Sequence, residues 1–358
     1  MRLVWLEVRD FRNHRETELE VPDGLVVAVG PNAQGKTNLL EAAHYLLSLG
    51  SPRTAADMPL VRSGAERAYL RGEVHTSTGR VLVEVEVRPS GANRVRMNGS
   101  AVRRLRDLRR RVRSVFSIPE DLAIVQGQPE DRRRFLDQTS LALWPAAEEA
   151  VRSYERALRQ RNRLLKEHDA PGAPPDLDAW DTELAGHGAA VTSVRGEAVD
   201  KVASGASAAF WSISGDRLTI RYAPSVEGED LLGAFVRRLA ERRADELIRR
   251  TTLVGPHRDE LELAVGELAI RRFASHGEAW AAALSLRLGT AEAVSNEVGE
   301  PAVVLLDDPF SGLDPSRRDR LQDGLRSRGQ VLISVPDEAQ VPAEATVWEV
   351  SEGGVRAR

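Results

Sequence analysis

One short motif constrains this chain more than any other feature: a glycine-rich loop between an apolar run and a helical run. The loop is Gly30-Pro-Asn-Ala-Gln-Gly-Lys-Thr37. Residues 25–29 before it are all apolar, and residues 38–47 after it carry apolar side chains at helical spacing. Strand, loop and helix in this order cradle phosphates, because the loop N–H groups and the helix N-terminus both favour an anion. The sequence therefore predicts an α/β P-loop fold that binds a nucleoside triphosphate.

The residues of the loop have distinct predicted roles. We expect Lys36 to reach the β- and γ-phosphates and Thr37 to place its hydroxyl on Mg²⁺. The other predicted nucleotide contacts in this segment are Gly30, Pro31, Asn32, Ala33, Gln34, Gly35 and Asn38. Lysine is scarce in this chain, since Lys36, Lys166 and Lys201 are its only examples, so a chance match to the motif is improbable.

A second constellation near the C-terminus supplies the other half of an ATPase. Residues 302–306 form a continuous apolar run that ends at Asp307 and Asp308. A strand buried on both faces has this pattern, and its C-terminal end is where ligands bind in doubly wound sheets. We expect Asp307 to hold Mg²⁺, directly or through water, and Asp308 to orient or deprotonate the attacking water. Lys36, Asp307 and Asp308 are thus the predicted catalytic residues, with Thr37 and Asp307 as metal ligands.

The composition excludes several classes of protein. The 358 residues are 42% hydrophobic and 29% charged, which is typical of a soluble protein with a large core and a second lobe. No apolar run reaches bilayer length and the first residues lack a signal-peptide stretch, so we expect a cytoplasmic protein without a membrane partner. The absence of cysteine excludes disulfides and thiolate metal sites.

Arginines gather in runs even though the net charge is −4. The runs lie at residues 103–113, 132–134, 159–163 and 237–250. Such runs can line one basic face of a nucleic-acid-binding protein, or they can be ordinary solvated helix faces.

The remaining patterns suggest how the chain is organised. Strands are expected at 3–8, 16–21, 26–29, 68–74, 81–87, 94–97, 112–116 and 218–222, and residues 68–97 suggest an antiparallel meander beside the nucleotide strand. Helices are expected at 147–167 and 177–210, forming a short hairpin around the Pro- and Gly-rich residues 168–176, and again at 277–298. We therefore predict an N-terminal ATPase part over 1–125, a mainly helical lobe over 126–250, and a C-terminal ATPase part over 251–358.

Further motifs carry a resemblance to known proteins. Ser275-His-Gly-Glu278 precedes the paired aspartates and Ser311-Gly-Leu-Asp314 follows them, an order that resembles the ABC-type ATPases. The long separation of Lys36 from Ser275 resembles the DNA-repair branch of that class. Seven stretches resemble the RecF family of bacterial recombination mediators. They are Asp10–His14, Pro31–Glu41, Phe116–Leu122, Arg132–Asp137, Leu158–Lys166, Gly255–Asp259 and Asp307–Asp314.

This resemblance implies a mechanism and partners. Each subunit would bind ATP on its own loop, and Ser275, Gly277 and Glu278 of a second copy would close over the γ-phosphate. Asp314, in the D-loop, and Arg12, near the adenine or a phosphate, would be further contacts. The resulting ATP-dependent homodimer would act as a clamp on single-stranded and duplex DNA, near junctions, and help load RecA-like protein with RecR-like partners. Slow, DNA-stimulated hydrolysis would reset it. The expected DNA contacts are the arginines at 103–113 and 159–163.

The chain departs from the family pattern at the signature. It reads Ser275-His-Gly-Glu-Ala-Trp280, whereas the family usually carries Ser-x-Gly-Gln-Gln-Arg, so a role of that arginine does not carry over. Pro309 and Gly312 also differ from the family pattern. Ser334 stands near the place of the switch histidine of transporters. These departures fit slow hydrolysis, and they leave open a DNA-binding scaffold that does not hydrolyse ATP.

Other interpretations are weaker. A transporter subunit should carry a switch histidine, and an SMC-like or nuclease-associated ATPase should carry long arms joined by a hinge or a cysteine-bound zinc hook. His257 has no second His or Cys at ligand spacing, which favours a structural role over a metal site. A Q-loop residue is expected after the strand at 112–116, where Glu120 is nearer than Gln126.

Overall fold

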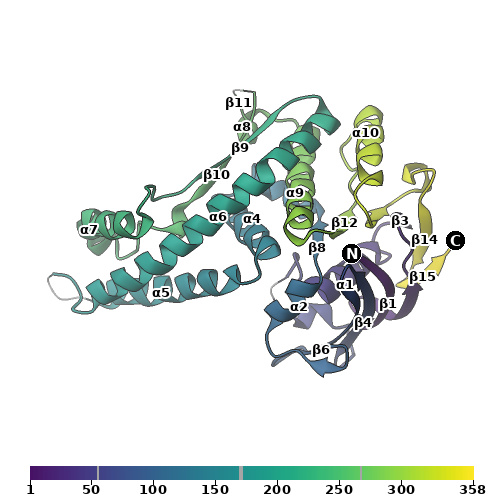
Figure 1. Cartoon of the computed structure of the whole chain (residues 1–358), viewed down its shortest axis with the longest axis horizontal. Helices are drawn as coiled ribbons and strands as arrows, with labels where there is room; N and C mark the ends of the chain where they lie inside the picture. The colour runs from purple at the N-terminus through teal and green to yellow at the C-terminus, as the bar shows by residue number, and fades with distance from the viewer. Residues whose placement is uncertain (55, 169–171, 267) are drawn as a thin grey trace. The chain divides into compact units, whose positions relative to one another are not determined.

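The computed structural model describes residues 1–54, 56–168, 172–266 and 268–358 (Figure 1). Its contacts divide the chain into two compact units. Unit 1 comprises residues 1–122, 204–218 and 273–358, and unit 2 comprises residues 123–203 and 219–272. The predicted α/β class is confirmed. The boundary predicted at residue 250 differs from the unit boundary at 272, because β10 (Glu260–Val265) belongs to a sheet of unit 2.

A mainly parallel sheet in unit 1 carries the nucleotide strand. Its order is β15-β14-β3-β13-β12-β8. The strands are β3 (Leu25–Val29), β8 (Ser114–Ser117), β12 (Val303–Asp307), β13 (Val331–Val335), β14 (Thr346–Ser351) and β15 (Gly354–Ala357). β3 runs parallel to β13 and β14, and β12 runs parallel to β13 and β8. Every residue of β12 and β13 is buried, as a strand covered on both faces requires.

A second, antiparallel sheet in unit 1 has the order β2-β1-β4-β5-β6-β7. Its strands are β1 (Arg2–Phe11), β2 (His14–Glu20), β4 (Ala68–Thr76), β5 (Gly79–Val87), β6 (Arg94–Met97) and β7 (Ser100–Ala101). The meander was expected beside the nucleotide strand, and this expectation is wrong: β4 pairs with β1, whereas β3 lies in the parallel sheet. The burial patterns give the reason, since β4 and β5 alternate while β3 is buried almost throughout.

Helix α1 (Lys36–Ser48) lies between the two sheets. It contacts β8, β12 and β13 on one side and β1, β4 and β5 on the other. Leu39, Leu40 and Leu46 are buried in one apolar cluster with residues of both sheets. Because this packing fixes the axis of α1, it also fixes the direction in which the preceding loop presents its N–H groups.

Helix α9 (His276–Val298) follows the signature and contacts β8. It begins and ends within a residue of the predicted range 277–298. The C-terminal end of α6 (Leu177–Ser214) packs against it so closely that a Cβ atom on Gly289 would lie 2.5 Å from the backbone nitrogen of Ala206. The other helices of unit 1 are α2 (Leu105–Arg111), α10 (Pro315–Arg326) and the short η1 (Met58–Leu60), η2 (Pro119–Asp121) and η4 (Glu338–Gln340).

Unit 2 has its own core, formed by Tyr154, Leu184, Phe235, Leu239 and neighbouring side chains. Its helical elements are α3 (Leu122–Gln126), α4 (Pro129–Leu143), α5 (Ala147–Glu167), the N-terminal part of α6, α7 (Leu231–Arg249), η3 (Pro256–Arg258) and α8 (Ile270–Phe273). Its sheet joins β9 (Leu218–Ala223), β10 and β11 (Leu268–Ala269).

The predicted helical hairpin corresponds to α5 and α6. α5 begins and ends at the predicted residues, whereas α6 continues to Ser214, beyond the predicted end at 210. Of the connection predicted at 168–176, residues 169–171 lie outside the described residues. Across the described ranges, no helix is both long enough and apolar enough to cross a membrane.

Candidate nucleotide-binding site

A cavity of about 450 Å³ lies where four neighbouring strands of the parallel sheet end. Its lining comes from the ends of β12 and β13, from the segments that follow β3, β8, β12 and β13, and from Arg53 after α1. The lining residues are Asn32, Ala33, Gly35, Lys36, Thr37, Asn38, Arg53, Pro119, Asp307, Asp308, Ser334 and Pro336. The carboxyl ends of parallel strands are the expected ligand position in such a sheet, and the volume falls in the range of small-molecule sites.

The backbone of the loop turns through left-handed conformations. Gly35 has φ 115° and Ala33 has φ 66°. A Cβ atom on Gly35 would also meet the side chain of Asn13, which can move, so position 35 favours glycine for its conformation. The turn leads directly into α1, whose first N–H groups have no partner within the helix and are available to an anion.

Neighbouring turns support the loop from behind. The buried ring of His14 lies between two carbonyl oxygens, with Nε2 3.0 Å from Gly35 O and Nδ1 2.8 Å from Gly353 O. Burial lowers the pKa of His14. The side chain of Gln34 accepts a hydrogen bond from the N–H of Glu352 at 2.7 Å, and Asn13 donates to Gln34 O at 3.0 Å. Gln34, a predicted nucleotide contact, therefore supports the loop, and it is not among the described residues that line the cavity.

The polar side chains that the two motifs predicted meet at the cavity. Lys36 Nζ donates to Gly30 O at 2.6 Å and to Pro31 O at 2.8 Å, and burial lowers the pKa of Lys36. Thr37 Oγ1 is 2.8 Å from both carboxylate oxygens of Asp307. A hydroxyl beside a carboxylate is the hard oxygen donor set that Mg²⁺ prefers, so these residues fit that ion.

Asp308 and Ser334 complete this group. Ser334 Oγ donates to Asp307 Oδ1 at 2.5 Å and accepts from the N–H of Asp308 at 3.0 Å. Asp308 has φ 47°, a conformation uncommon for a residue with a Cβ atom. Burial raises the pKa of Asp308, and the charge of Asp307 adds to the effect. Burial likewise raises the pKa of Asp307. A carboxyl held in this way is suited to accept a proton from water.

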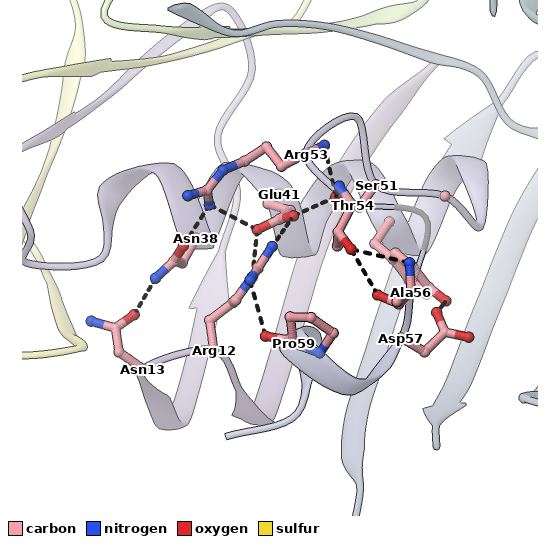
Figure 2. A network of polar contacts seen from close by, with 12 residues as sticks. Arg12, Asn13, Asn38, Glu41, Ser51, Arg53, Thr54, Ala56, Asp57 and Pro59 are labelled. Carbon is pink, nitrogen blue, oxygen red and sulfur yellow. Dashed lines mark hydrogen bonds and ion pairs between the residues drawn. The ribbon is translucent and has the colours of Figure 1, made fainter. Parts of the chain in front are cut away.

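A network around Glu41 fixes two arginines beside the loop (Figure 2). Glu41 is fully buried. Arg12 donates to its two oxygens at 2.9 and 2.8 Å, and also to Pro59 O at 3.0 Å. Arg53 donates from NH1 to Glu41 Oε2 at 3.1 Å and to Asn38 Oδ1 at 2.9 Å. Arg12, a predicted contact, is thus engaged by Glu41 and is not among the described residues that line the cavity, whereas Arg53 is.

Sequence reasoning missed Arg53 and Glu41. Two signals were available: Glu41 interrupts an otherwise apolar stretch of α1, and Arg53 lies in the short polar segment that follows that helix. Arg53 also contributes to the electrostatics of the metal position. Burial raises the pKa of Asp307, and the nearby positive charge of Arg53 acts against that rise.

The signature residues lie elsewhere on unit 1. Ser275 caps α9: its hydroxyl accepts from the N–H of Glu278 at 3.3 Å, and the Glu278 carboxylate accepts from the N–H of Ser275 at 2.8 Å. These hydrogen bonds lower the pKa of Glu278. A Cβ atom on Gly277 would lie 2.7 Å from Gly312 O, so the signature packs directly on the D-loop. Within the described ranges, Ser275, Gly277, Glu278 and the α10 cap Asp314 do not line the cavity.

At position 280, where the chain departs from the family pattern, the side chain makes an internal contact. Trp280 is 3% exposed, and its indole Nε1 donates to Pro309 O at 3.0 Å. Ala279 beside it is fully buried. Trp280 therefore links the signature helix to the segment after the paired aspartates.

Two further predictions concern Glu120 and His257. Glu120 follows Pro119, which lines the cavity, and its charge adds to the rise that burial causes in the pKa of Asp307. His257 lies in unit 2, where Nδ1 is 2.6 Å from Tyr154 Oη and Nε2 is 3.0 Å from Thr252 O. Burial lowers the pKa of His257 to about 4. Among the described residues, no group of three or more His, Cys, Asp or Glu could hold a metal ion.

Comparison with known proteins gives the family that the sequence motifs resemble, over nearly the whole chain. Residues 2–353 match the model described as the RecF/RecN/SMC N terminal domain. The chain is 42% identical to the DNA replication and repair protein RecF of Streptomyces avermitilis, with 99% of each chain covered. It is 43% identical to that of Acidothermus cellulolyticus, with 96% of each covered.

Solved structures agree with these relatives. The structure of the recombination mediator protein RecF-ATP in the RecFOR pathway is similar to this chain with a TM-score of 0.89 and 28% identity, over 99% of this chain and 97% of that one. An Smc head domain from Pyrococcus furiosus, at 16% identity and a TM-score of 0.56, shares the fold; 99% of this chain and 95% of that one are covered. The chain belongs to the RecF family of DNA replication and repair proteins.

Proposed function

We propose that this chain is an ATP-dependent DNA clamp of replication and gap repair, in which ATP and Mg²⁺ join two copies head to tail. ATP would occupy the cavity at the end of the parallel sheet. The loop N–H groups and Lys36 would hold its phosphates, while Thr37 and Asp307 would hold Mg²⁺. Asp308 would position the attacking water and take up its proton.

The separation of the signature from the cavity carries this proposal. The cavity has loop and aspartate residues on its walls, but Ser275, Gly277 and Glu278 are not among the described residues that line it. A phosphoryl group in transfer needs charge stabilisation on every side, and the residues that line this cavity leave one side open to water. The signature residues of a second copy can supply the missing side of the site. Because each copy would offer both halves, a two-fold dimer would bury two nucleotides.

Two features favour the signature as an intermolecular surface. Ser275 and Asp314 are exposed, and each is the N-cap of a helix. The packing of Gly277 on Gly312 holds the signature and D-loop together, so both would meet the partner as one body. Helix N-termini carry partial positive charge, which suits the approach of α9 to a γ-phosphate.

The family supplies the biological setting. The relatives are DNA replication and repair proteins, and the similar solved structure is a recombination mediator of the RecFOR pathway. We infer that the closed dimer of this chain holds DNA at junctions and cooperates with RecR-like partners in loading a RecA-like protein. Hydrolysis would open the dimer, so slow turnover would set how long the clamp lasts.

Mass measurement in solution, with and without ATP and Mg²⁺, tests the proposal. We expect a monomer without ATP and a dimer with ATP for the wild type. Asp308→Asn should accumulate the dimer because hydrolysis is blocked. Ser275→Arg should bind ATP with wild-type affinity yet remain a monomer, whereas Lys36→Ala should lose ATP affinity. A Ser275→Arg protein that dimerises like the wild type would overturn the proposed closure.

A further inference from the structure

The segment from Arg88 to Arg111 is the most basic part of the chain. It contains nine arginines and a single carboxylate, Asp107, in a protein whose net charge is −4. The arginines are Arg88, Arg94, Arg96, Arg103, Arg104, Arg106, Arg109, Arg110 and Arg111. In the structure this segment is the end of β5, the β6–β7 hairpin and α2, all within unit 1.

Five of these nine arginines are exposed and have no carboxylate partner among the described residues. Arg96, Arg103, Arg104, Arg110 and Arg111 are exposed, and no residue that the structure describes forms an ion pair with them. At the start of the segment, Arg67, Arg88 and Arg94 share a single carboxylate, Glu86, at 3.0, 2.8 and 3.6 Å. These three arginines also line a cavity of about 460 Å³. Positive charge therefore exceeds negative charge along the whole segment.

The fold brings the exposed arginines together. Arg94 and Arg96 flank the buried Val95, so they emerge on the same face of β6. Val102 N donates to Val95 O at 2.9 Å, which places Arg103 and Arg104 beside β6. The helix α2 that follows is fixed to the body of unit 1 through the buried Leu108 and through Arg109, which donates to Ser48 O at 2.6 Å. We call this surface, formed by β6, β7 and α2, the α2 surface.

The arginine runs of unit 2 differ, because carboxylates pair with most of their arginines; among the described residues, Arg237 and Arg249 are exposed and form no ion pair. Arg159 and Arg163, expected to contact DNA, pair with Glu155 and Glu167 one helical turn away, and Arg161 is fully buried. The other runs are similar. Their pairs are Arg132–Glu260, Arg133–Glu130, Arg134–Asp131, Arg238–Glu241, Arg242–Asp245 and Arg243–Asp178. The structure thus separates the α2 surface from the run at 159–163, which the sequence also offered as a DNA contact.

We propose that the α2 surface binds the phosphate backbone of DNA, with Arg96, Arg103, Arg104, Arg110 and Arg111 as direct contacts. Unpaired positive charge attracts a polyanion and releases its condensed counterions. The guanidinium fork matches phosphate oxygens, so arginine gives two donors per contact without reading the base sequence. This assignment rests on the proposed function, since it names where the clamp holds its DNA.

The test uses two variants with the same change of charge. The surface variant carries Arg103→Gln, Arg104→Gln, Arg110→Gln and Arg111→Gln. The control carries Arg152→Gln, Arg163→Gln, Arg238→Gln and Arg242→Gln, from helices of unit 2 where each arginine has a carboxylate neighbour. DNA affinity with ATP and Mg²⁺ is measured from 50 to 200 mM salt, on duplex and single-stranded oligonucleotides. ATP affinity and dimer formation verify that each variant folds.

The surface variant should bind DNA more weakly at low salt and show a weaker salt dependence than the wild type. Four lost phosphate contacts lower the slope of log affinity against log salt by about 3.6 on duplex DNA, so the variant loses about 100-fold less affinity across that salt range than the wild type does. The control should keep the wild-type slope. An unchanged slope in the surface variant would overturn the assignment. Equal losses in both variants would also overturn it. Absence of DNA binding by the wild type would instead contradict the proposed function.

Discussion

Adding a single methyl group at Gly277 should separate nucleotide binding from dimer closure. A Cβ atom at this position would lie 2.7 Å from the backbone oxygen of Gly312. Since neither atom belongs to a flexible side chain, the signature and the D-loop must move apart. Forcing an extra methyl into a well-packed contact costs roughly 1–3 kcal/mol. The phosphate-binding loop is untouched, because Gly277 does not line the cavity among the described residues.

We therefore expect Gly277→Ala to lower the midpoint of thermal unfolding by several degrees and to keep wild-type ATP affinity, while the ATP-induced dimer is lost. Gly324→Ala is the matched control: it lies within α10 of the same unit, and an added Cβ atom there would meet nothing within 4 Å. That control should gain about 0.5–1 kcal/mol from the better helix propensity of alanine and should dimerise normally. The reasoning is refuted if Gly277→Ala unfolds at the wild-type temperature and dimerises at the wild-type ATP concentration.

Three further changes test the energetics. Burial raises the pKa of Asp308, and the charge of Asp307 raises it further. The contribution of Asp308 to stability therefore falls as the pH rises through that raised pKa. Asp308→Asn should accordingly raise the unfolding midpoint of the nucleotide-free protein at pH 7, and calorimetry should find the gain fading towards pH 4; a gain that grows on acidification would contradict this sign. Trp280→Phe removes the hydrogen bond to Pro309 O and should cost about 1 kcal/mol in denaturant unfolding with ATP affinity retained. Arg161→Leu leaves Glu246 buried without its partner and should cost about 3–5 kcal/mol, whereas the exposed Arg159→Leu should stay within about 0.5 kcal/mol; similar effects of the two would rule out the buried pair as a main support of unit 2.

The sequence predicts the elements of this fold where one physical pattern dominates. The continuous apolar run before Asp307 has the pattern of a strand covered on both faces, and β12 is buried throughout. The helix at 147–167 shows its apolar side chains at helical spacing, and α5 has those bounds. The strands of the meander are also present as predicted. Their sheet was misassigned, because alternation reveals that a strand has one exposed face but not which neighbour it pairs with.

Parts of the site depend on contacts that sequence patterns do not contain. Glu41 joins Arg12 and Arg53, which come from a turn and a loop far apart in the sequence, so their meeting depends on how α1 lies between the sheets. At position 280 the sequence indicates only that the role of the family's arginine does not carry over, whereas the structure shows a buried ring that donates to Pro309 O. Most carboxylate partners of the unit 2 arginines stand one helical turn away in the sequence, whereas Arg132–Glu260 and Arg243–Asp178 join distant segments and depend on the fold.

Complementation between two inactive variants tests the central claim most directly. Lys36→Ala destroys the cradle and keeps the signature, while Ser275→Arg does the opposite. Each alone should fail to hydrolyse ATP. Because neither variant should dimerise alone, every dimer in an equal mixture is mixed and holds one complete site out of two, so the account predicts recovery of up to about half of the wild-type rate, in step with the appearance of dimers. A mixture as inactive as its components, or a Ser275→Arg protein that hydrolyses ATP alone, would contradict a site shared between two copies.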